Sequence, residues 1–84
     1  MSANNNMQQR IRELLEEALP MVDLDSSFLF SELDSLGVTT ILMLLSTEYG
    51  VELEHRDVTP KNFKSIESLA MMVQQKLDEG QQQG

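Results

Sequence analysis

The chain contains no cysteine, which excludes disulfides, thiolate metal sites and cysteine nucleophiles. Basic residues are also scarce, since six Lys and Arg face fourteen Asp and Glu and leave a net charge of −8. This excess of acid argues against binding to a nucleic-acid backbone and favours contact with basic protein surfaces. The one histidine, His55, lies in a polar stretch and is expected at the solvated surface, so neither a Ser–His pair nor a histidine metal site is predicted.

Long hydrophobic runs are missing as well. The longest spans residues 41–45, far short of the roughly 20 residues that a membrane-spanning helix needs. The polar residues 1–6 contain no cationic segment followed by an apolar one, so no secretory signal is predicted. We therefore expect a cytoplasmic protein that does not bind a membrane. We also expect it to be a monomer and not to bind nucleic acid.

At 84 residues the chain is expected to form one domain with a small core. A domain of this size buries only about 60% of the surface that its unfolded chain exposes. Because disulfides and thiolate metal sites are excluded, its stability must come from helix packing alone. A substrate pocket of even roughly 300 Å³ would be hard to enclose in such a bundle. We therefore do not expect an enzyme.

Three segments place apolar residues at the spacing of an amphipathic helix. Pro20 is expected to end the first helix, because a residue before proline is pushed out of the α region. Gly50 is a natural residue beyond the end of the second helix, Ser65 is the expected N-cap of the third, and Gly80 is expected just past its end. The periodic residues are Met7, Ile11, Leu14, Leu15, Ala18 and Leu19, then Val38, Ile41, Leu42, Leu45 and Tyr49, then Ile66, Leu69, Ala70, Val73 and Leu77.

The connections complete a prediction of fold class: an all-α, small four-helix bundle with three main helices, one short helix and a long first loop. Residues 21–34 form that loop, whose apolar side chains are expected to pack across the bundle. Residues 51–53 are expected to be an extended linker, and the short helix is expected near residues 56–59. The folded domain is expected to span residues 7–77, with disordered ends at 1–6 and 78–84. The expected core is Ile11, Leu14, Leu15, Val38, Ile41, Leu42, Leu45, Ile66, Leu69 and Val73.

The tripeptide Asp34-Ser35-Leu36 stands where the charged loop meets the apolar second helix. A helix N-terminus presents unpaired N–H groups and a positive partial charge, which favour an attached phosphate. The arrangement suits a serine that receives a phosphoryl group rather than one that attacks a substrate. The alternative is structural, because serine is also an ordinary N-cap residue.

Two apolar residues of the second helix, Leu36 and Met43, lie nearly opposite its core face at about 100° per residue. Thr40 and Thr47 share this outer face. Leu36 and Met43 either pack against the first loop or the short helix, or form an exposed strip for a partner beside Ser35.

Acidic residues gather around the second helix and the loop that follows it. They are either paired catalytic carboxylates or a solvated face with a role in docking, and we favour the second interpretation. The group consists of Glu32, Asp34, Glu48, Glu52, Glu54 and Asp57.

The first loop imitates a calcium-binding EF-hand, with Asp23, Asp25 and Ser27 at alternate positions. Such a loop requires a sharp turn at its sixth position, normally Gly, and a bidentate Glu at its twelfth. These positions hold Phe28 and Asp34, so no calcium site is predicted.

Taken together, these motifs resemble an acyl carrier protein of the phosphopantetheine-binding family, which includes peptidyl carrier domains. The resemblance covers roughly residues 7–77 and rests on Asp34-Ser35-Leu36, the acidic-aromatic-Gly stretch at 48–53, the loop aromatic Phe28, and residues 63–70. It implies that Ser35 carries 4′-phosphopantetheine, transferred from coenzyme A by a separate Mg²⁺-dependent phosphopantetheinyl transferase. The terminal thiol then holds acyl groups as thioesters for acyl-loading and acyl-processing enzymes. Asp34 would help to orient the serine or the metal of the transferase.

The chain also departs from the family pattern. Glu32 stands where the family usually has Gly, and the positions that are acidic in many fatty-acid carriers hold Gly37, Thr40, Ser46 and Thr47. Docking is therefore expected to use Leu36 and Met43, with Glu32, Glu48, Glu52 and Glu54 around them. This pattern favours a dedicated, stand-alone carrier in fatty-acid, polyketide or specialised-metabolite biosynthesis. The alternatives are an aminoacyl or peptidyl carrier, and a helical interaction module without the prosthetic group.

Overall fold

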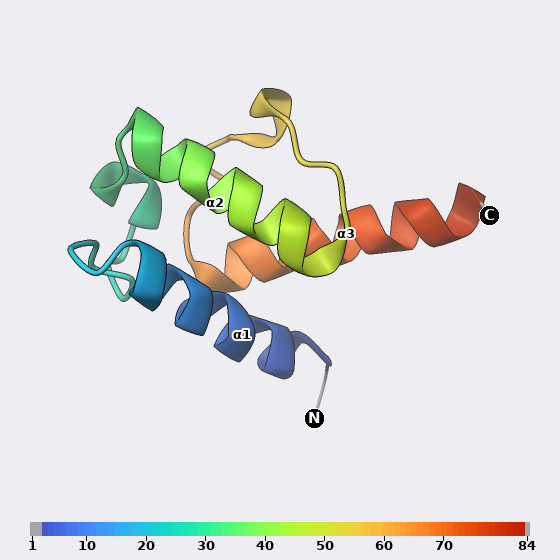
Figure 1. The fold of residues 1–84 in the computed structure, drawn as a ribbon, viewed down its shortest axis with the longest axis horizontal. Coiled ribbons are helices and arrows are strands. Elements are labelled where there is room, and N and C mark those ends of the chain that lie inside the picture. The colour runs from blue at the N-terminus through green and yellow to red at the C-terminus, as the bar shows by residue number, and fades with distance from the viewer. Residues whose placement is uncertain (1–2, 84) are drawn as a thin grey trace.

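Three helices enclose the core in the computed structural model, which describes the backbone of residues 3–83 and the side chains of residues 6–80. The helices are α1 (Ala3–Ala18), α2 (Ser35–Tyr49) and α3 (Ile66–Gln83), and two short 3-10 turns, η1 (Leu29–Glu32) and η2 (His55–Asp57), lie in the connections. Figure 1 shows α1 and α2 running in opposite directions, so that the end of α2 lies on the same side as the start of α1. The described residues contain no strand, and the predicted all-α class is confirmed.

The helix ends that adjoin the two connecting loops lie where Pro20, Gly50 and Ser65 predict them. α1 ends at Ala18, two residues before Pro20. Gly50 closes α2 in the left-handed conformation, at φ 63 and ψ 33, which a residue without Cβ adopts at little cost. Ser65 caps α3, because its Oγ accepts a hydrogen bond from the Ser68 N–H at 3.2 Å.

The outer ends of the chain differ from the prediction. Residues 1, 2 and 84 lie outside the described residues. The rest of the expected disordered ends is helical, since α1 begins at Ala3 and α3 continues through Gly80 to Gln83. Adding a residue to an existing helix is far easier than starting one, and a single glycine costs only about 1 kcal/mol relative to alanine. Gly80 therefore does not end α3, and that prediction is wrong.

The apolar periodicity of the sequence did not predict η1. Four residues are too few to show a helical repeat, so the first loop looked irregular. Its first residue, Leu29, is fully buried, and the Leu29 N–H donates to the Lys64 carbonyl at 2.8 Å. Phe30 packs edge-on against Phe63, with ring centroids 6.3 Å apart. The first loop is thus fixed to the segment that leads into α3.

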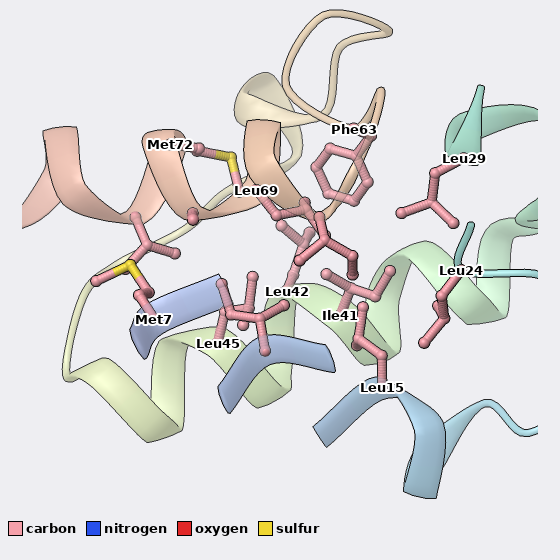
Figure 2. Packing of buried hydrophobic residues seen from close by; sticks show 14 residues of the cluster. Met7, Leu15, Leu24, Leu29, Ile41, Leu42, Leu45, Phe63, Leu69 and Met72 are labelled. Atoms are coloured by element: carbon pink, nitrogen blue, oxygen red, sulfur yellow. The ribbon is translucent and has the colours of Figure 1, made fainter. Parts of the chain in front are cut away.

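The core lies where the three helices meet the first loop (Figure 2). Eight of the ten expected core residues are buried, while Leu14 and Val38 are partly buried and pack against the others. The remaining buried apolar residues are Met7 and Ala70 on the predicted helix faces, Leu24, Leu29 and Phe63 in the connections, and Met72 of α3, which lies beside the predicted face.

The loop after α2 is fastened to α3 by Asp57. Its Oδ2 accepts from the Glu54 N–H at 2.9 Å, and its Oδ1 lies 3.2 Å from the Lys76 Nζ. Burial by itself would raise the pKa of the Asp57 carboxyl, but the Glu54 N–H and the ammonium of Lys76, with a smaller effect from Arg56, together lower it. The charged form of Asp57 therefore stabilises this loop.

Replacing Asp57 by Asn is expected to lower the free energy of unfolding at neutral pH by about 1–2 kcal/mol, because a hydrogen bond to a charged group is lost. The pKa of Asp57 is lower in the folded than in the unfolded chain. Its contribution is therefore complete above the unfolded pKa of about 4 and disappears as pH falls through the folded pKa. Urea denaturation at several pH values should show the wild type and Asp57→Asn converging in acid. A constant difference down to low pH would contradict this role.

Candidate functional site

Ser35 is the first residue of α2, and its side chain is exposed. The N-cap is Asp34, whose Oδ1 accepts from the Gly37 N–H at 2.8 Å. The alternative that Ser35 itself is the cap is therefore wrong. The cap does not use the serine hydroxyl, which remains available for modification.

The first turn of α2 supplies the electrostatics of this site. The first N–H groups of a helix have no carbonyl partner within it, and together they carry a positive partial charge. Asp34 satisfies the N–H of Gly37, and the Asp34 carbonyl accepts from the Val38 N–H at 3.0 Å. The N–H groups of Ser35 and Leu36 precede these in the turn. A phosphodiester on the Ser35 oxygen would lie at the end of the helix that favours an anion.

Gly37 allows the first turn to pack closely. A Cβ at this buried position would lie 3.3 Å from Asp34 Oδ1 and 3.4 Å from Leu33 Cδ2, which is tighter than most real contacts. The missing side chain thus leaves room for the capping carboxylate and for Leu33. Both neighbours help to hold the serine in one place.

The apolar strip predicted beside Ser35 is exposed. The side chain of Leu36 is 73% exposed and that of Met43 is 60% exposed, so the alternative in which they pack against the loop or the short helix is wrong. The Thr40 hydroxyl, on the same face, donates to the Leu36 carbonyl at 2.8 Å. A partner that approaches this face therefore meets mainly apolar surface.

Intramolecular ion pairs occupy part of the predicted acidic docking group. Arg10 of α1 binds Glu48 through both carboxylate oxygens, at 3.0 and 3.4 Å, and the pKa of its guanidinium is raised chiefly by this hydrogen bond. Glu54 lies 3.0 Å from Arg56, and Asp57 pairs with Lys76. Within the described part of the chain, Glu32, Asp34 and Glu52 form no ion pair, so these three remain open to a partner's cations.

Tyr49 ends α2 next to Glu48. Burial raises the pKa of its phenol, and the negative charge of Glu48 raises it further. Among the described residues its buried hydroxyl has no hydrogen-bond partner. The neutral phenol therefore serves packing at the end of α2, away from Ser35.

Two open hollows flank Ser35. One, of about 500 Å³, is lined by residues that include Ser35 and Thr39 of α2 and His55 and Val58 of the loop that follows it. The second, of about 600 Å³, lies between the end of α1, the first loop and the start of α2. The sequence placed His55 at the surface, where it is, but did not place it near Ser35. Only the folding of the loop at 50–64 brings the two together.

The carboxylates that imitate a calcium loop have structural partners. Asp23 Oδ1 accepts from the Asp25 N–H at 3.0 Å, and Asp25 pairs with Arg12 at 2.7 Å. In the part of the chain that the structure describes, no group of three His, Cys, Asp or Glu side chains is arranged to hold a metal ion. Nor is any described helix both long and apolar enough to cross a bilayer.

The fold and the site define a small helical protein with an exposed serine, Ser35, at the start of α2. A family model for the phosphopantetheine attachment site matches residues 7–73, which is most of the chain. The chain therefore belongs to the phosphopantetheine-binding carrier family. The comparisons with curated proteins and with solved structures each gave no match.

Membership of this family establishes the kind of protein. It is a carrier and not an enzyme, and its prosthetic group is 4′-phosphopantetheine. Carrier proteins interact with a phosphopantetheinyl transferase and with loading and processing enzymes. The residues at the start of α2 fit the group, because they combine an exposed hydroxyl, a cap that does not use it and a helix N-terminus for its phosphate.

Proposed function

We propose that this carrier holds acyl intermediates as thioesters on a 4′-phosphopantetheine arm attached to Ser35. The observation that carries the proposal is the division of roles at the start of α2, where Asp34 caps the helix and leaves the Ser35 hydroxyl exposed. The arm supplies a thiol, and the thiol holds the cargo. We place the protein in fatty-acid, polyketide or specialised-metabolite biosynthesis.

In the modification reaction this chain has to supply little more than a correctly placed serine hydroxyl. The Ser35 oxygen attacks the pyrophosphate of coenzyme A, an O–P bond forms, and the adenosine bisphosphate leaves as the pyrophosphate bond breaks. The serine proton passes to a base of the transferase. Asp34 helps by geometry, because its Oδ1 is held by the Gly37 N–H at 2.8 Å while its other oxygen can face the transferase's metal.

The test is intact-mass measurement after incubation with coenzyme A, Mg²⁺ and a broad-specificity transferase. We expect the mass to increase by one phosphopantetheine group. An unchanged mass would contradict the proposal and support the rival, a helical interaction module without an arm. Glu32, at the position where the family usually has Gly, is the feature that favours this rival.

The chemical nature of the group on the thiol distinguishes an acyl carrier from an aminoacyl or peptidyl carrier. The protein purified from its own cells should carry a group that hydroxylamine releases, because hydroxylamine cleaves thioesters. We expect an acyl hydroxamate without a free amine. A released amino-acid hydroxamate would instead identify a carrier that is loaded by an adenylating enzyme.

We infer that partners dock on Leu36 and Met43. Because both side chains are largely exposed, Leu36→Glu and Met43→Glu should change the free energy of unfolding by less than about 0.5 kcal/mol. Each should weaken recognition by the transferase or a pathway enzyme, since the new charge must be desolvated where apolar contact was made. Glu32, Asp34 and Glu52 should add a modest salt dependence, with smaller contributions from the paired Glu48 and Glu54.

Met71→Glu is the matched control for docking, because Met71 is 59% exposed on α3. It should leave partner affinity unchanged, as measured by surface plasmon resonance against the transferase. If Leu36→Glu and Met43→Glu unfold the domain while the folded fraction keeps its affinity, the strip is not a docking surface. The monomeric state and the cytoplasmic location stay predictions.

A further inference from the structure

The hollow on the loop side of Ser35 has no role in the site described so far. It measures about 600 Å³ and is bounded by the end of α1, the first loop and the first turn of α2. Its apolar lining includes Leu19, Val22 and Leu36, and its charged lining consists of Glu32 and Asp34. No cation is among the described residues that line it. The hollow is thus apolar at its wall and negatively charged at one side.

Met21 stands on the wall of this hollow with 94% of its side chain exposed. Met21 lies in a turn of the backbone that is closed by a hydrogen bond from the Val22 N–H to the Leu19 carbonyl at 3.1 Å. The next part of the loop is held to α1 by Arg12, which lies 2.7 Å from Asp25. Met21 therefore adds almost nothing to the core, yet it holds apolar surface in water beside an apolar hollow.

The hollow is continuous with the surface that any modifying enzyme must cover. Asp34, Leu36 and Gly37 line it, and Ser35 lies between the first two of these in the chain. An active site that reaches the Ser35 oxygen must bring its surface over these neighbours. Met21 and the hollow then fall within the same contact area.

We propose that this hollow, with Met21 on its wall, receives an apolar side chain of the phosphopantetheinyl transferase, and that a lysine or arginine next to that side chain meets Glu32. The inference rests on the proposed modification of Ser35. The apolar wall selects the inserted side chain, and the two carboxylates select its basic neighbour. Glu32 thus serves recognition at a position where it also departs from the family pattern.

Steady-state kinetics of a broad-specificity transferase tests the proposal, with coenzyme A saturating and the carrier concentration varied. Met21→Glu places a carboxylate where the apolar contact is expected, and should raise KM about tenfold, the effect of losing one central interface contact. The kcat should stay within about twofold, because a contact made equally in the bound state and the transition state affects KM alone. Met21→Leu should retain the wild-type KM.

Met71→Glu is the matched control, since it makes the same change at an exposed methionine of α3 that does not line this hollow. Its KM should equal that of the wild type. Glu32→Gln should reduce the dependence of KM on salt, because it removes the charge that attracts the transferase's cation. Circular dichroism should show the same helix content in all four variants.

Three results would overturn the proposal, and they distinguish its failure from that of the proposed function. Wild-type KM for Met21→Glu, or an equal rise for Met71→Glu, rejects the docking hollow while the modification of Ser35 stands. Absence of any mass increase in the wild-type protein rejects the proposed function, and the docking hollow with it.

Discussion

Replacing Ser35 by Ala is expected to abolish the attachment of 4′-phosphopantetheine and leave the fold intact. The variant removes the only oxygen to which the group is proposed to be joined. The fold should tolerate the change because Asp34, and not Ser35, caps α2, and because alanine is the best helix former. Intact-mass measurement after treatment with coenzyme A and the transferase should show the unmodified mass, with unchanged helical circular dichroism.

Ser31→Ala provides the control for this loss. Ser31 is also exposed and lies four positions before Ser35, where its hydroxyl donates to the Phe28 carbonyl at 2.7 Å. This variant should be modified as completely as the wild type. Modification that persists in Ser35→Ala would reject Ser35 as the attachment residue.

Replacing Leu69 by Ala is expected to cost about 2–5 kcal/mol of stability, the range for removing a fully buried leucine side chain. Leu69 is 0% exposed and belongs to the buried apolar cluster between the three helices (Figure 2). Because a small domain has only about 5–15 kcal/mol in total, the variant should be close to unfolding at physiological temperature. Leu42→Ala, at 7% exposed, should show a similar loss. Urea denaturation followed by circular dichroism measures both.

Met71→Ala controls for the effect of truncating a side chain on the same helix. Met71 lies two residues after Leu69 and is 59% exposed, so its truncation should cost less than about 0.5 kcal/mol. Losses below about 1 kcal/mol at both Leu42 and Leu69 would contradict the assignment of the helix faces to the core.

Local signals made the helices predictable. Apolar spacing placed the core faces of α1, α2 and α3, and eight of the ten expected core residues are buried. Pro20, Gly50 and Ser65 marked inner boundaries because each acts on the backbone within a few residues of itself. The same helical geometry placed Leu36 and Met43 opposite the core face, but it left open whether the first loop or the short helix covers them.

Features that depend on distant parts of the chain could not be predicted. η1 is held by the bond between Leu29 and Lys64, and Glu48 is bound by Arg10 across 38 positions. Neither pairing produces a pattern in the neighbouring sequence from which it could be predicted. The nearness of His55 to Ser35 likewise depends on how the loop after α2 returns.

The N-cap residue of α2 could not be assigned from the sequence for a different reason. Aspartate and serine are almost equally good N-cap residues, so adjacent Asp34 and Ser35 could not be ranked from the sequence. The structure assigns the cap to Asp34, and that assignment separates the structural role from the proposed functional one. It is the clearest gain in the site over the sequence alone.

Tandem mass spectrometry of the modified wild-type protein tests the central claim most directly. After treatment with coenzyme A and the transferase, the protein is digested and the peptide that carries phosphopantetheine is fragmented. The account predicts one modified peptide, with the group on Ser35. A group on any other serine, or no modified peptide at all, would contradict it.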